Sequence, residues 1–144
     1  PIDFPADWQQ RAEDAGFNNI RELYEFFVSD LAQLLIDQLR EMYPSTDIFS
    51  IPTGWATFDL EEMHQNDLLL DDISLFGSFE RAIFTDAKGH QGEVVVTTGA
   101  LIWLSSIYGV HLRNNDFDTG FNTDLHTVAE EIVVNHDPEY INNP

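Results

Sequence analysis

Residues 81–108 read RAIFTDAKGHQGEVVVTTGALIWLSSIY, and this stretch decides the fold class. Its first four residues, Arg81-Ala-Ile-Phe84, are predicted to be a short extended segment. Residues 85–92 form a turn-rich segment with two glycines. From Glu93 to Tyr108 the valine run favours a strand, yet apolar residues recur at helical spacing over about 15 residues, which is long for a strand. Because Gly109 then suits a helix stop, the stretch predicts a strand, a loop and a buried helix.

The strongest helical pattern lies upstream, between Ile20 and Met42, where apolar residues recur every three or four positions. Asn18 or Asn19 is a suitable N-cap, and a glutamate lies three residues after Asn19, as a capping box requires. Pro44 closes the pattern. The segment is therefore predicted to be an amphipathic helix that faces the core.

The rest of the chain completes an α/β pattern that is rich in helix and poor in strands. We expect an N-terminal arm or loop over 1–19, a buried strand over 47–51, a helix over 55–65, a long ordered loop over 66–79 and a final helix over 123–135 that Pro138 ends. These strands are too few for a complete doubly wound sheet. Residues 1–144 are thus expected to be a single domain or the C-terminal part of one, completed by a missing segment or another chain.

Composition narrows the classes of function. The chain has 144 residues, 43% of them hydrophobic, so it is long enough for a core without disulfides or a metal. With a formal net charge of −20 it should be repelled by nucleic acid and anionic lipid, although a protein that imitates the charge of DNA would look the same. The absence of cysteine excludes thiol redox chemistry and thiolate metal sites.

The sequence leaves the cellular location unknown. No basic segment followed by an apolar one opens the chain, so no signal peptide is predicted. The longest apolar stretch, Val94–Val110, is too short and too polar for a membrane span. The chain begins with Pro1, which indicates either a trimmed methionine or a piece of a longer precursor.

Asp86 and His90 are the candidate catalytic residues. They lie four positions apart in the glycine-containing loop that precedes the predicted buried helix. A carboxylate beside an imidazole fixes its tautomer and stabilises its protonated form, and α/β enzymes place catalytic groups on such loops. The alternative is a polar turn in which the aspartate accepts a hydrogen bond from a backbone amide.

The other candidate sites carry weaker patterns. His64, His111, His126 and His136 have no paired spacing and are read as surface or interface histidines. Residues 114–124 alternate oxygen-bearing side chains as a calcium loop does, but they lack its central glycine and its final glutamate. Gly77-Ser78 lacks the nucleophile elbow that a catalytic serine occupies. No metal or cofactor is therefore expected.

Two passages of the chain together form a recognisable pattern. The later one contains Ile83-Phe-Thr-Asp86, His90, Gly92, Ala100-Leu-Ile-Trp103 and Ile107-Tyr-Gly109. The upstream one contains Leu39–Pro44, Ile48–Pro52 and Gly54-Trp-Ala56. Over about residues 20–135 the chain thereby resembles SGNH (GDSL-type) hydrolases. The last conserved block of that family has an Asp and a His after a strand, then a glycine turn and a helix rich in alanine and leucine, and its upstream passage is helix, proline, strand and I-P-x-G-x-A.

The resemblance implies a partial three-layer α/β/α fold of the flavodoxin-like SGNH type, and the Asp86 and His90 of a Ser-His-Asp triad. His90 would be the general base and Asp86 its orienting partner, acting on a small ester or an acylated carbohydrate. The spacing of this pair is one residue longer than in the family, and Gln91 replaces the usual proline. The Gly-Asp-Ser block is absent, so the serine would come from a partner chain or an N-terminal segment. Gly16-Phe-Asn-Asn19 only superficially matches the oxyanion block, because no apolar strand precedes it.

Three hypotheses remain open from the sequence. The first is the C-terminal part of an SGNH-like ester hydrolase. The second is a non-catalytic acidic binding or interaction module that keeps part of a hydrolase fold. The third is a small acidic protein that binds calcium or imitates DNA. The high acidity alone equally fits a protein adapted to high salt, since net charge bears on solubility rather than on fold.

Overall fold

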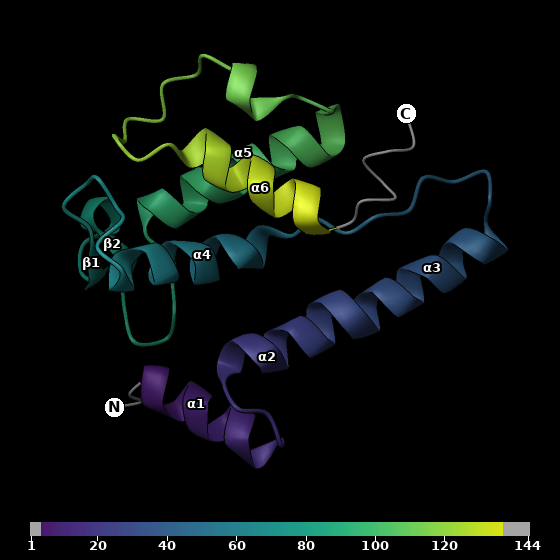
Figure 1. The fold of residues 1–144 in the computed structure, drawn as a ribbon, viewed down its shortest axis with the longest axis horizontal. Coiled ribbons are helices and arrows are strands. Elements are labelled where there is room, and N and C mark those ends of the chain that lie inside the picture. The colour runs from purple at the N-terminus through teal and green to yellow at the C-terminus, as the bar shows by residue number, and fades with distance from the viewer. Residues whose placement is uncertain (1–3, 137–144) are drawn as a thin grey trace. The chain divides into compact units, whose positions relative to one another are not determined.

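The computed structural model describes residues 4–136, and the chain divides into two compact units, Pro1–Ser50 and Ile51–Pro144 (Figure 1). Each unit has its own elements, and each is described by itself. Within the described range, no helix is both long enough and apolar enough to span a membrane.

The first unit is helical from its start. Its elements are α1 (Phe4–Asp14), α2 (Ile20–Tyr24), a π-helical segment (Glu25–Leu31) and α3 (Ala32–Met42). The expectation of an irregular arm over residues 1–19 is therefore wrong. Helix α1 has a narrow apolar side, on which Trp8 is half-buried and Ala12 is buried. Side-chain pairs four positions apart also support it, with Gln9 bonded to Glu13 and Gln10 to Asp14.

The predicted helix between Ile20 and Met42 is present, with the predicted ends. The Asn19 side chain caps it by accepting a hydrogen bond of 2.9 Å from the backbone N–H of Glu22. The Glu22 carboxylate in turn accepts from the backbone N–H and the side-chain amide of Asn18, a capping box displaced by one residue. The helix ends at Met42, two residues before Pro44.

The prediction that this helix faces a core is wrong for most of its length. Of residues 20–42, Ile36 alone is buried. The remaining large apolar side chains are half-buried or exposed. The sequence pattern identified an apolar face correctly, but a pattern does not say what covers that face.

The predicted strand over residues 47–51 is also wrong, because the segment has no regular structure. A strand requires a neighbouring chain for its backbone groups, and one of these is already occupied. The carbonyl of Ile48 accepts a hydrogen bond of 2.9 Å from Nε of Arg40, so a helix side chain takes the place of a strand partner.

The second unit combines helices with a small parallel sheet. Its elements are α4 (Thr53–Gln65), β1 (Ser74–Phe76), a 3₁₀ turn (Phe79–Arg81), β2 (Ala82–Phe84), α5 (Glu93–Tyr108), a second 3₁₀ turn (Leu112–Asn114) and α6 (Leu125–His136). In the part of the chain described, the sheet has two strands, paired with Ser74 opposite Ala82 and Phe76 opposite Phe84. A helix-rich chain with a parallel sheet is compatible with the α/β prediction.

Helix α5 is the centre of the second unit. It packs against α6 and α4 and reaches β2. The core is formed by fully buried side chains from all these elements: Leu60, Ile83, Val94, Val95, Ile102, Leu112 and Leu125. Gly109 ends α5 in the left-handed conformation, with φ of 63°, as its predicted role as a stop requires.

Candidate functional site

The candidate site is the loop of residues 85–92, which joins the carboxyl end of β2 to the first turn of α5. Both ends of the loop are tied to β2. The backbone N–H of Thr85 donates to the carbonyl of His90 at 2.7 Å, and that of Gly92 donates to the carbonyl of Ile83 at 2.8 Å. Phe84 and Gln91 form an antiparallel bridge between these bonds. The loop is thus a tight turn whose two ends are held close together by backbone hydrogen bonds.

The structure brings the predicted pair, Asp86 and His90, into direct contact. Oδ2 of Asp86 lies 2.5 Å from Nδ1 of the His90 ring. Oδ1 of Asp86 accepts from the backbone N–H of Lys88 at 2.9 Å and from that of His90 at 3.4 Å. The hydrogen bond from the His90 ring, helped by these two amides, holds the pKa of the Asp86 carboxyl below its ordinary value.

The pair lies at the surface. The side chain of His90 is 70% exposed and that of Asp86 44%. With Nδ1 engaged by a carboxylate, the neutral ring carries its proton on Nδ1, and Nε2 becomes a hydrogen-bond acceptor. No side chain of residues 7–136 other than Asp86 makes a hydrogen bond or ion pair with this ring. The arrangement therefore offers Nε2 as a proton acceptor toward solvent.

Gly92 makes this geometry possible through a close approach of two backbones. A Cβ atom at this position would lie 1.8 Å from the carbonyl oxygen of Ala82 and 3.2 Å from that of Phe79. Only glycine permits the start of α5 to lie so close to β2. Because this contact fixes where the loop ends, it also fixes the span over which Asp86 and His90 must meet.

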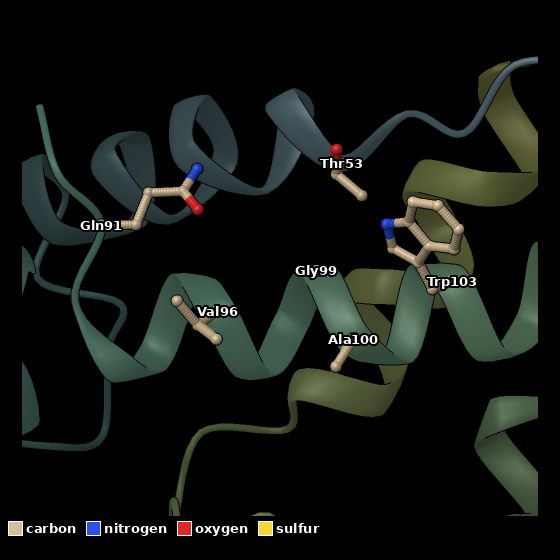
Figure 2. Close-up of a pocket in the computed structure, with 6 residues that line it drawn as sticks. All are labelled: Thr53, Gln91, Val96, Gly99, Ala100 and Trp103. Carbon is tan, nitrogen blue, oxygen red and sulfur yellow. The ribbon is translucent and has the colours of Figure 1, made fainter.

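A shallow groove of about 260 Å³ lies next to the loop, and Gln91, the residue after His90, is part of its lining. Figure 2 shows its lining, which comes from the start of α4, the end of the loop and one face of α5: Thr53, Gln91, Val96, Gly99, Ala100 and Trp103. The side chain of Gln91 donates to the hydroxyl of Thr57 in α4 at 3.0 Å. His90 is not part of this lining, so this groove does not contain the imidazole.

No serine of the described chain completes a triad at the imidazole. Ser78 precedes the 3₁₀ turn, and its side chain bonds Glu80. The Gly16–Asn19 segment follows helix α1 rather than a strand, and the side chains of Asn18 and Asn19 are engaged in capping the next helix. The structure therefore gives the oxyanion-like match no support.

In the acidic loop over residues 114–124, side-chain oxygens accept hydrogen bonds from residues close to them in sequence. Asp118 accepts from the backbone N–H of Gly120, and Asp124 accepts from the backbone and hydroxyl of Thr127 at the start of α6. Across residues 4–136, no three acidic or histidine side chains gather where they could hold a metal ion. The loop is explained by turns and a helix cap.

Sequence reasoning missed two features around the site. The close approach at Gly92 had a signal, since a glycine directly before a long helix suggests a backbone contact. The sequence also contained a signal for the groove. Gly99 and Ala100 lie between Val96 and Trp103 at helical spacing, and their small side chains leave room on that face.

Comparison of the chain with protein-family models, with curated proteins and with solved structures finds no match in any of the three. The resemblance to SGNH hydrolases therefore rests on the residues of this chain alone.

Proposed function

We propose that the chain is the C-terminal part of an SGNH-like ester hydrolase, with His90 as general base and Asp86 as its orienting partner. The observation that carries the proposal is the 2.5 Å contact between Oδ2 of Asp86 and Nδ1 of His90, which leaves Nε2 free of protein partners in the described chain. In a Ser-His-Asp triad the carboxylate holds the imidazole in this tautomer.

The place of the pair in the fold supports the same role. The loop follows the carboxyl end of a parallel strand and precedes a helix, which is where open α/β sheets place their reacting groups. Under this proposal the two strands and the helices of the second unit belong to a three-layer α/β/α domain. The remaining strands, with the serine, are supplied by a partner chain or by an N-terminal segment.

The chemistry of such a site is acyl transfer. Nε2 of His90 accepts the hydroxyl proton of the serine as the serine oxygen attacks the ester carbonyl, and it then delivers that proton to the departing alkoxide. Water releases the acyl group from the serine by the same exchange, which returns the proton to the serine oxygen. Asp86 stays ionised and stabilises the imidazolium form, which its lowered pKa favours. The substrate is a small ester or an acylated carbohydrate.

The test uses the natural gene product that contains this chain, together with whatever segment carries the serine. It should hydrolyse p-nitrophenyl butyrate and be labelled by a fluorophosphonate probe. His90→Ala should lower both rates on the order of 10³-fold or more, because the base is lost. Asp86→Asn should lower them strongly with the fold intact, because the ring is then held in the wrong tautomer.

His64→Ala is the matched control, since His64 lies in α4 outside the loop and should leave both rates unchanged. Full activity of the His90→Ala protein, or a gene product that neither hydrolyses esters nor takes the probe, would reject the hydrolase.

One observation favours a second candidate, a non-catalytic acidic binding module. Asp86 accepts three hydrogen bonds from its own turn, so the turn alone accounts for the pair without any chemistry. In that case Asp86→Asn lowers the stability of the loop, and the esterase assay shows no activity to lose.

A further inference from the structure

The helical segment over residues 20–42 carries an exposed apolar stripe that no role assigned so far uses. The stripe consists of Phe27, Leu31, Leu34, Leu35 and Met42, whose spacings of three, four and seven place them on one side of a helix. Each is between 48% and 61% exposed. Figure 1 shows this segment as one continuous helical ribbon, and the exposed Gln38 lies among these residues on the same side of the helix.

The area of the stripe is that of an interaction surface. A large apolar side chain presents roughly 200 Å² when fully exposed, so five half-exposed ones present about 500 Å². Contiguous apolar patches of this size lie at the upper end of what monomeric proteins expose. A partner that covers the stripe with an equal area of its own brings the total buried surface of the two partners to about 1,000 Å². This total is close to the minimum for a specific interface.

A row of acidic side chains borders the stripe. Asp30, Asp37 and Glu41 are exposed and follow one another at spacings of seven and four, which aligns them about 100° around the helix from the stripe. Asp37 forms an ion pair of 3.3 Å with Arg40, which also donates to the carbonyl of Ile48. The negative charge along the border is therefore carried by Asp30 and Glu41.

Charge decides which occupant fits. A second copy of the chain also carries a net charge of −20, and its own stripe has the same acidic border, so self-pairing leaves both rows unmatched. Anionic lipid and nucleic acid are disfavoured for the same reason. A helix with apolar residues at matching spacing and lysine or arginine along its edge satisfies both the stripe and the row, as flanking charges do in coiled coils.

We propose that the stripe is the docking surface for a basic amphipathic helix of a partner protein. Apolar burial against Leu31, Leu34 and Leu35 provides the affinity, and the charges of Asp30 and Glu41 select the sign of the partner's charge and its register. This role is independent of the hydrolase proposed for the second unit.

The experiment measures binding of a synthetic 21-residue peptide, with leucines at helical spacing and lysines elsewhere, by fluorescence anisotropy. A second peptide has glutamate in place of each lysine. We expect the lysine peptide to bind, to gain helicity, and to weaken as salt is raised, and the glutamate peptide to bind at least about 10-fold more weakly.

Leu34→Asp should weaken binding of the lysine peptide at least about 10-fold, although it adds a negative charge, because it removes the centre of the stripe. The double change Asp30→Asn and Glu41→Gln should weaken it a few-fold and flatten the dependence on salt. Leu70→Asp is the matched control, since Leu70 is 71% exposed, lies in the second unit and should not affect binding. Circular dichroism confirms that each variant is folded.

Two results would overturn the proposal. If Leu34→Asp binds the lysine peptide as tightly as the unchanged chain, attraction is by net charge alone and the stripe is not used. If the chain without peptide sediments as a dimer that Leu34→Asp dissociates, the occupant is a second copy of the chain.

Discussion

The carboxylate of Asp71 is predicted to be a main stabilising contact of the second unit. Its Oδ1 accepts from the backbone N–H and the side-chain amide of Asn122, at 2.9 and 3.0 Å. Its Oδ2 accepts from the backbone N–H and the hydroxyl of Thr123, at 2.9 and 2.7 Å. The contact joins the loop after α4 to the residues before α6, and Thr123 is buried.

Asp71→Asn should cost about 2–3 kcal/mol of the free energy of unfolding. An amide keeps one acceptor oxygen, but its NH₂ group then faces the two donors of Thr123. Hydrogen bonds to a charged group are worth about 1.5–3 kcal/mol each, and a buried donor left unsatisfied costs about 1–3 kcal/mol. For a unit of this size the loss lowers the melting temperature by roughly 10 °C or more.

The effect should also depend on pH. Partial burial alone would raise the pKa of the Asp71 carboxyl, but the hydrogen bonds from Asn122 and Thr123 outweigh it and hold the pKa below its ordinary value. A depressed carboxyl pKa stabilises the fold above the unfolded value of about 3.9, and this stability is lost as the pH falls through the folded value. The difference in the free energy of unfolding between the chain and its Asp71→Asn variant should therefore become smaller below about pH 4.

Urea unfolding followed by tryptophan fluorescence measures this loss. Changing Trp8 to Phe in all proteins leaves Trp55 and Trp103, which both belong to the second unit. Asp72→Asn is the control, because the neighbouring Asp72 side chain is 98% exposed and makes one ion pair of 3.7 Å with Arg81. Equal unfolding midpoints for Asp71→Asn and Asp72→Asn, or a difference that does not change with pH, would refute the reasoning.

Two further changes test how the backbone is held. Gly92→Ala should destabilise the second unit by more than about 3 kcal/mol in urea unfolding, because the new Cβ would lie 1.8 Å from the carbonyl oxygen of Ala82; Gly99→Ala, which meets no atom within 4 Å, is the control and should not destabilise. Asn19→Ala should lower the stability of the first unit by about 1 kcal/mol, seen as a lower melting temperature in far-UV circular dichroism, because the cap on the N–H of Glu22 is lost. An unchanged melting temperature would show that the displaced capping box alone holds this helix end.

The sequence predicted helices well where local signals agreed. Helix α5 begins and ends where the pattern placed it, because its length and Gly109 outweighed the strand propensity of its valines. Helix α1 was missed because its apolar side is narrow, with Trp8 and Ala12 among polar residues, and because pairs of polar side chains contribute to its stability.

Features that depend on distant residues could not be predicted in the same way. Residues 47–51 have the composition of a strand, but a strand exists only where a partner meets it, and here the side chain of Arg40 takes the carbonyl of Ile48. The contact of Asp86 with His90 was predictable because they lie four positions apart in a closed turn. Their exposure was not, since it depends on what packs around the loop.

The segment after the candidate pair determines the side from which a reacting group can approach it. Gln91 is bridged to Phe84 of β2, and its amide donates to Thr57 of α4. The neighbouring ring of His90 is 70% exposed, meets Asp86 and does not line the groove along α5. Under the hydrolase proposal, a serine and its ester therefore reach Nε2 from the solvent side of the ring and not through this groove. The hydrolase proposal thus requires that a partner chain or an N-terminal segment brings the serine to the exposed side of the loop. The esterase assay is therefore decisive only when it includes the segment that carries the serine.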